Sequence, residues 1–221
     1  MIQRVMIFFN ERVMLSALAH GDYAKAELAL GHLQRWEGRT RRVMHNLAVV
    51  RMGQGRFAEA EALFEQQIED YGDNPDLLRA LAETAYLAGD RAHAARRIEA
   101  ALAEPECPEP ELLKRRAAIC ADPRAHAKSM EGKKNFAAAL AHLGKGEKDA
   151  AIDAFRRAAD ADPSDFVALN NLGALLMNHA KDYAGAARVF EKALALSEQA
   201  LMRDNLAKAR DKAQQKAKGK A

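Results

Sequence analysis

The chain has 221 residues, a formal net charge of +3 and 29% charged residues. This length leaves open one large domain or two small ones, and either would bury a sizeable core. The sequence is rich in Ala, Leu, Glu, Arg and Lys, which are strong helix formers, and has only 6 Pro and 13 Gly. This composition predicts an all-α fold and excludes a β-rich one.

The positive charge is concentrated at the C-terminus, where residues 203–221 hold seven Lys or Arg against two Asp. The rest of the chain is close to neutral. A basic end of this kind is most often a solvated helix end or tail, and it is also compatible with binding to an acidic partner. We therefore expect no nucleic-acid partner, and we keep binding of nucleic acid or an anionic surface through this segment as an alternative.

The N-terminal segment has one apolar run, residues 5–9, which is too short for the core of a signal peptide. No stretch approaches the roughly 18 consecutive apolar residues of a membrane-spanning helix. We expect a cytoplasmic protein without a membrane span; a periplasmic location is the alternative if a signal or anchor precedes this sequence. The cysteines, Cys107 and Cys120, form no CxxC pair, which predicts no zinc site and fits a reducing compartment.

The most informative feature is a six-residue pattern that begins with Gly, or once with Lys, and ends with Ala. It occurs at 21–26, 55–60 and 89–94, 34 residues apart each time, and again at 146–151 and 181–186, 35 residues apart. A 34-residue period is that of a helix-turn-helix repeat. Each leading Gly falls where one helix must end, because Gly tolerates the left-handed backbone conformation that closes a helix.

Each pattern opens a second helix with a buried stripe. Four and seven residues after the final Ala come these pairs: Leu30 and Leu33, Phe64 and Gln67, Ile98 and Ala101, Phe155 and Ala158, Phe190 and Ala193. Spacings of four and three residues trace one face of a helix. Twelve residues before the final Ala, most first helices carry a small residue that lets the two helices approach closely: Ala48, Ala82, Ala139 and, after a one-residue insertion near Ala180, Gly173.

The stretch 168–173, Ala-Leu-Asn-Asn-Leu-Gly, continued by Tyr183, Ala186, Phe190 and Ala193, resembles a tetratricopeptide repeat. Five such units in register cover residues 7–198, with one interruption. The resemblance implies an all-α, right-handed superhelical solenoid of stacked helix-turn-helix units. The sequence departs from the family pattern because the usual Trp is absent and the closing Pro occurs only as Pro163.

The interruption lies between the third and fourth units, where residues 110–121 look like the first helix of a decayed repeat. Asp122 and Pro123 then form a helix start, and the pattern from 124 to 143 fits one long helix or two short ones. We expect the following domains: 1–104, an N-terminal array of three units; 105–131, a degenerate repeat or irregular connection; 132–198, two C-terminal units; 199–213, a capping helix; 214–221, a disordered basic tail.

The sequence contains no HExxH, GxSxG, phosphate-binding glycine loop or GxGxxG that follows a strand. The seven histidines occupy unrelated positions in the repeats, without metal-ligand spacing. We therefore expect no catalytic residue, no metal, no cofactor and no small-molecule substrate, and we predict that the chain is not an enzyme.

The resemblance implies that the first helices line a concave wall that binds a protein or peptide. The candidate groove residues are Arg42, His45, Asn46, Val49, Arg79, Glu83, Tyr86, Lys133, Phe136, Leu140, Asn170, Asn171 and Met177. In related proteins Asn at the places of Asn46 and Asn171 often bonds a peptide backbone; the alternative is that Asn simply belongs to the repeat consensus. The family's carboxylate clamp is not matched, because its positions hold Glu11, Leu15, Asn46, Asp76 and Ala80.

The predicted groove is cationic around Arg41, Arg42, Arg51 and Arg79 and more apolar around Phe136 and Leu140. This pattern favours a helical or extended ligand with acidic and apolar residues. The leading hypothesis is therefore a non-catalytic scaffold or adaptor, for example in the assembly of a larger complex. Besides the basic tail, a repeat domain of a larger enzyme or membrane assembly stays an alternative, and an oligomer is compatible with the sequence.

Overall fold

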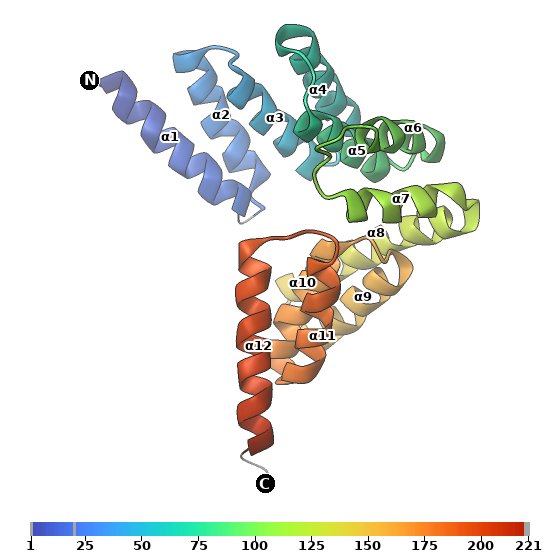
Figure 1. The fold of residues 1–221 in the computed structure, drawn as a ribbon. Coiled ribbons are helices and arrows are strands. Elements are labelled where there is room, and N and C mark those ends of the chain that lie inside the picture. The colour runs from blue at the N-terminus through green and yellow to red at the C-terminus, as the bar shows by residue number, and fades with distance from the viewer. Residues whose placement is uncertain (1, 20, 219–221) are drawn as a thin grey trace. The chain divides into compact units, whose positions relative to one another are not determined.

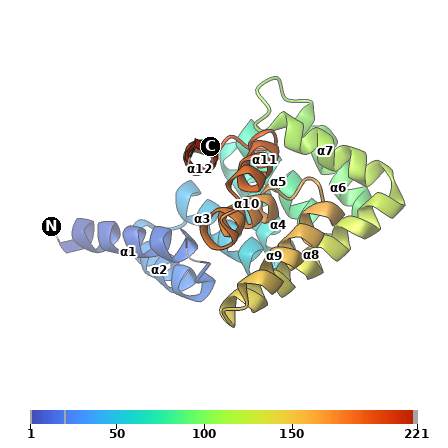
Figure 2. The same cartoon turned by 90° about the horizontal axis from the view of Figure 1, so that it is seen from below.

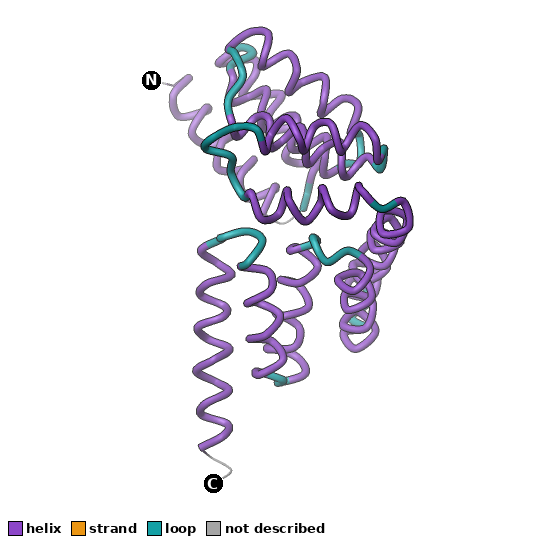
Figure 3. Tube along the Cα trace, turned by 45° about the vertical axis from the view of Figure 1, so that its right-hand side comes forward, coloured by secondary structure: helices purple, strands orange, loops and turns teal. Residues whose placement is uncertain are grey.

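The computed structural model describes residues 2–19 and 21–218, and every regular element in these ranges is a helix (Figure 3). The predicted all-α solenoid of helix-turn-helix units is confirmed. The chain divides into two compact units, Met1–Pro108 and Glu109–Ala221.

The first unit contains six helices: α1 (Ile2–Ala19), α2 (Tyr23–Glu37), α3 (Arg41–Gly53), α4 (Phe57–Tyr71), α5 (Pro75–Ala88) and α6 (Arg91–Leu102). Each helix packs against the next, and the closest pairs are α1 with α2, α3 with α4, and α5 with α6 (Figure 1). These pairs are the three predicted N-terminal repeats.

The second unit contains α7 (Pro110–Ala121), α8 (Pro123–Gly144), α9 (Lys148–Ala161), α10 (Phe166–Leu175), a π-helical turn (Leu176–Ala180), α11 (Tyr183–Leu194) and α12 (Ala200–Lys218). Helices α8 and α9 lie side by side along their length (Figure 2), and α10 pairs with α11. Helix α12 runs along α11 and covers its outer side.

The turn inside each helix pair uses a left-handed residue at the predicted place. Gly21, Gly55, Gly89 and Gly146 have φ values of 69°, 74°, 90° and 78°. In the fifth unit Lys181 takes the same conformation, with φ of 54°. All five first helices are therefore followed by a residue in the left-handed backbone conformation. Only in the fifth unit does this residue carry a Cβ, which makes the conformation sterically less favourable.

The predicted stripes form the core. The final Ala of each pattern is fully buried, and the large residues four positions later are 0–2% exposed: Leu30, Phe64, Ile98, Phe155 and Phe190. Aromatic and aliphatic side chains of this size bury enough apolar surface to hold a helix pair together.

The small residue of each first helix faces this stripe. Ala48, Ala82 and Ala139 are fully buried, and a Cβ added to Gly173 would lie 2.7 Å from the Phe190 ring. The inserted residue near Ala180 is accommodated by the π-helical turn Leu176–Ala180, a frequent way to fit one extra residue into a helix.

Two predicted boundaries are wrong. The boundary between 131 and 132 falls inside α8, a single 22-residue helix that begins at Pro123, so the long-helix alternative is the correct one. Gly132 does not break this helix. It is buried, and a Cβ there would lie 3.1 Å from the Ala158 backbone oxygen, so Gly is placed where α8 and α9 come closest.

The capping helix is longer than predicted. We expected it to end at 213, with 214–221 disordered, yet α12 continues to Lys218; residues 219–221 lie outside the described residues. Two features explain the extension. Its last residues are Ala, Gln and Lys, which favour helix, and the Lys216 Nζ donates to the Lys181 backbone oxygen at 3.0 Å.

Candidate functional site

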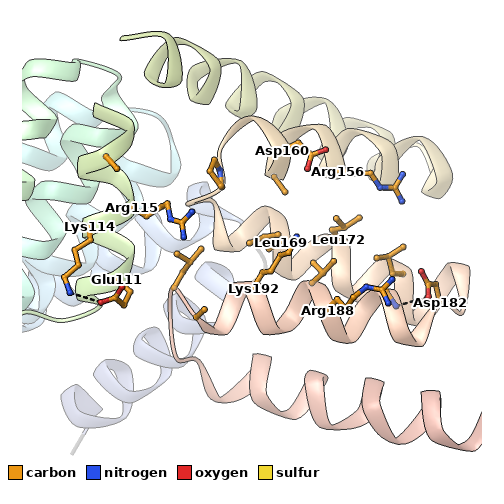
Figure 4. Close-up of a pocket in the computed structure, with 18 residues that line it drawn as sticks. Glu111, Lys114, Arg115, Arg156, Asp160, Leu169, Leu172, Asp182, Arg188 and Lys192 are labelled. Carbon is orange, nitrogen blue, oxygen red and sulfur yellow. Dashed lines mark hydrogen bonds and ion pairs between the residues drawn. The ribbon is translucent and has the colours of Figure 1, made fainter. Parts of the chain in front are cut away.

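The second unit contains a groove of about 1040 Å³ between α7, α9, α10 and α11 (Figure 4). Its floor is apolar and includes Leu169, Leu172, Leu176, Val189 and Leu196. The first three follow one another at spacings of three and four, so they form one stripe along α10 and the π-helical turn. These three side chains are 4–7% exposed and also belong to the hydrophobic core, so they give the groove an apolar floor of which only a small part is exposed.

The edges of the groove are rich in cations: Lys114, Arg115, Arg156, Arg188 and Lys192 against the acidic Glu111, Asp160 and Asp182. In Figure 4, Leu169 and Leu172 lie between the helix that carries Arg156 and the helix that carries Arg188 and Lys192. The groove therefore combines a hydrophobic floor with an excess of positive charge at its edges.

Some of these charges are already paired. Lys114 bonds Glu111 at 2.8 Å and Arg156 bonds Asp153 at 2.9 Å, whereas Asp182 caps α11 by accepting from the Gly185 backbone N–H. In the part of the chain that the structure describes, Arg115, Arg188 and Lys192 have no ion-pair partner. These three exposed cations are available to an acidic ligand.

A second, smaller cavity of about 330 Å³ lies in the first unit, between α3, the end of α4 and the start of α5. Its lining includes Arg41, His45, Asp76 and Arg79. Burial lowers the pKa of His45, the positive charges of Arg79 and Arg41 lower it further, and Asp76 opposes them. The His45 imidazole is therefore neutral near pH 7 and packs edge-on against Phe64, with ring centroids 5.5 Å apart.

Across residues 2–19 and 21–218, no three His, Cys, Asp or Glu side chains are grouped so that they could hold a metal ion. Within the same ranges, no helix combines the length and apolar character needed to cross a membrane.

Sequence comparison identifies the repeat. Two profiles, both described as tetratricopeptide repeat, match residues 136–200 and 40–71. The chain contains tetratricopeptide repeats. These two matches fall in different units of the structure, and tetratricopeptide repeats as a class are stacked helix pairs that present surfaces for interaction.

Solved structures with a similar arrangement of helices include MamA from Desulfovibrio magneticus RS-1, at 17% identity over 86% of this chain and 94% of that one, with a TM-score of 0.40. Pseudomonas aeruginosa pilF is 14% identical over 95% and 90%, with a TM-score of 0.44. The TPR2AB domain of yeast Sti1 is 14% identical over 97% and 86%, with a TM-score of 0.46. No curated protein sequence matches the chain, so neither a ligand nor a process is assigned by similarity.

In the first unit, the predicted groove residues are largely engaged within the chain. Arg42 bonds Glu37 at 2.6 Å and also pairs with Glu11; its hydrogen bonds to Glu37 raise its pKa. Arg79 bonds Glu83 at 2.7 Å. Val49 is half-buried.

The structure brings only two of these predicted residues into one cavity, His45 and Arg79. The prediction that Tyr86 is exposed is wrong, since its side chain is 1% exposed. Helix α5 packs against both α4 and α6, which buries most of its surface, including Tyr86.

In the second unit, none of the predicted residues lines the groove. Phe136 packs edge-on against Phe155, with ring centroids 5.4 Å apart, and Leu140 is 49% exposed. The pKa of Lys133 is lowered to about 8, chiefly by burial; Asp162 opposes this shift and Arg116 adds to it.

The two asparagines of α10, Asn170 and Asn171, are half-buried, and the Asn171 side chain donates to the Val167 backbone oxygen at 3.0 Å. The prediction that Met177 is exposed is wrong, because its side chain is 5% exposed and belongs to the hydrophobic core. Met177 lies in the π-helical turn, whose wider coil changes the direction of side chains relative to a regular α-helix.

The groove residues were missed because the family resemblance places ligand contacts on first helices, whereas Arg156, Arg188 and Lys192 lie on second helices, α9 and α11. One signal was present in the sequence. Arg188 and Lys192 are four residues apart, as neighbours on one helix face are, and no acidic residue lies three or four positions from Lys192.

Proposed function

We propose that this protein is a non-catalytic interaction module that holds an acidic, amphipathic segment of a partner protein in the groove of its second unit. The observation that carries the proposal is the apolar floor of Leu169, Leu172 and Leu176 next to the unpaired cations Arg188 and Lys192. Such a module serves as a scaffold or adaptor in the assembly of a larger complex.

The two halves of the groove favour different parts of one ligand. Burial of apolar surface contributes about 25 cal/mol per Å² and supplies most of the affinity, so leucine-like side chains of the partner fit the floor. The cations contribute more to orientation and to the rate of association than to affinity. A helix with apolar residues at i, i+3 and i+7 and acidic residues beside them matches both features.

The role of the predicted concave face stays a separate proposal, made for each unit by itself. The side-chain N–H groups of Asn46 and Asn171 bond the carbonyl four residues earlier in their own helices, each at 3.0 Å. Their side-chain oxygens are left as acceptors for a backbone N–H of an extended peptide, which supports the role that the family resemblance implies.

The test uses a fluorescein-labelled 16-residue peptide of Leu and Glu in helical register, with a scrambled peptide of the same composition as its control. Binding is followed by fluorescence anisotropy. We expect the double substitution Arg188→Glu with Lys192→Glu to weaken binding at least about tenfold, because the edge charges then repel the peptide. Unchanged affinity of this variant would exclude the groove as the site.

A matched control changes the same charge elsewhere in the second unit. Arg157 and Lys208 are exposed and do not line the groove, so Arg157→Glu with Lys208→Glu is expected to change affinity less than about threefold, through long-range charge alone. Equal weakening by both double variants would show that the peptide responds to net charge rather than to the groove.

The alternative is binding of nucleic acid through the basic end, and it is tested by substitutions in α12 rather than by deletion of this helix. Met202 and Ala209 of α12 are 2% and 0% exposed, so removal of this helix would uncover the core. Lys212→Gln with Lys218→Gln keeps the helix, and a salt-dependent loss of binding to DNA on this change would favour the alternative.

A further inference from the structure

The smaller cavity in the first unit contains two buried polar atoms that nothing in the described chain satisfies. Gln67 is 1% exposed, and its Oε1 has no hydrogen-bond partner among the described residues; the same holds for the buried Nδ2 of Asn74. Both side chains line the cavity. Buried polar atoms are nearly always hydrogen-bonded, so each unsatisfied atom requires an explanation, such as a group from outside the chain.

The hydrogen bonds that these two side chains already make determine which polar atom of each is unsatisfied. The Nε2 of Gln67 donates to the Leu63 backbone oxygen at 3.2 Å, which leaves Oε1 as a free acceptor. The Oδ1 of Asn74 accepts from the Leu77 backbone N–H at 3.1 Å as the cap of α5, which leaves Nδ2 as a free donor. Reversing either amide would break the bond that it already makes. The cavity therefore offers one acceptor and one donor that do not satisfy each other.

We infer that this cavity binds an amide group of a partner polypeptide, because an amide carries the matching pair, one N–H donor and one C=O acceptor. A carboxylate would accept from Asn74 but would place a second acceptor against Gln67 Oε1. The cations Arg41 and Arg79 outnumber Asp76 in the lining, so an amide beside acidic residues fits best. The site lies in the first unit and does not depend on the groove proposed above.

The test compares three N-acetylated, C-amidated tripeptides, Asp-Gln-Asp, Asp-Glu-Asp and Asp-Met-Asp, whose central side chains have nearly the same shape. Their binding is measured by NMR titration of the side-chain amide signals of Asn74 and Gln67. The Gln peptide is expected to bind at least about fivefold more tightly than the other two, the loss that follows when a polar partner goes unpaired. If all three peptides bind equally and both variants below lose this binding, the site binds a main-chain amide. That outcome also supports the inference.

Two variants and a control complete the test. Gln67→Leu removes the acceptor, and Asn74→Ser keeps a capping oxygen for α5 but removes the amide donor; each is expected to weaken binding about fivefold, whereas Asn135→Ser, outside the cavity, is expected to leave it unchanged. Tighter binding of the Glu peptide would overturn the inference in favour of an anion site. No shift of either signal at millimolar peptide, or binding insensitive to both variants, would overturn it in favour of water alone.

Discussion

The close approach of Gly173 to Phe190 gives a quantitative test of packing in the last repeat. In Gly173→Ala the new Cβ would lie 2.7 to 2.9 Å from three atoms of the Phe190 ring. The ring is fully buried, so it has little room to move. Overpacking of this kind costs about 1–3 kcal/mol, and the gain in helix propensity from Gly to Ala returns about 0.5–1 kcal/mol. We therefore expect a net loss of stability of roughly 1–2 kcal/mol.

The assay is urea unfolding followed by circular dichroism, with Gly144→Ala as the matched control. A Cβ at Gly144 would meet nothing within 4 Å, so this change is expected to be neutral or stabilising by up to about 1 kcal/mol. Other repeats carry Ala at the place of Gly173, so the test asks whether Phe190 leaves room for it. A Gly173→Ala variant as stable as the Gly144→Ala variant would refute the reasoning, because Phe190 would then have room to shift.

Three further predictions concern backbone strain and protonation. Lys181→Gly is expected to stabilise the protein by up to about 1 kcal/mol in the same urea assay, since Gly removes the strain of a left-handed Lys, and a loss of stability would contradict this. The pKa of His45 is lowered in the folded protein, so His45 takes up a proton more readily in the unfolded chain. Stability is therefore expected to fall as pH drops below about 6.5. His45→Gln should flatten this part of the plot of stability against pH, and an unchanged slope would show that another group causes it. Burial raises the pKa of Asp165 to about 6, so the contribution of this carboxyl to the free energy of unfolding is expected to fall as pH rises from about 4 to 6. The carboxyl carbon of Asp165 should titrate near 6 in an NMR experiment. A midpoint near 4 would exclude the buried environment.

The helix pairs were predictable because their signals are local. The Gly that ends one helix and the buried stripe that begins the next helix lie within about 14 residues of each other. Stripe residues such as Phe64, Phe155 and Phe190 are buried in their helix pairs. The long helix α8 was harder, because Gly132 is compatible with a break, and only its packing against Ala158 shows why Gly is there.

The groove was not predictable from the same signals. Its floor uses Leu169, Leu172 and Leu176, which are core positions of α10 and the π-helical turn with only 4–7% exposure. That they line a groove depends on how α7, α9 and α11 are arranged around them. The unsatisfied atoms of Gln67 and Asn74 are likewise a result of three-dimensional packing, since each side chain already makes one local hydrogen bond. The sequence shows which side chains are present, whereas the exposure of a side chain and the hydrogen bonding of its polar atoms depend on how the helices pack.

Helix α12 covers the outer side of α11, where a further repeat could otherwise pack. Met202 and Ala209 bury themselves on the side of α11 where the first helix of another repeat would pack, and Arg210 adds an ion pair to Glu191 at 2.9 Å. A longer array therefore cannot be made by fusing repeats after Lys218, because the growing face is already occupied. An engineer would instead splice new repeats after α11 and move α12 to the new end, where it would again close the array.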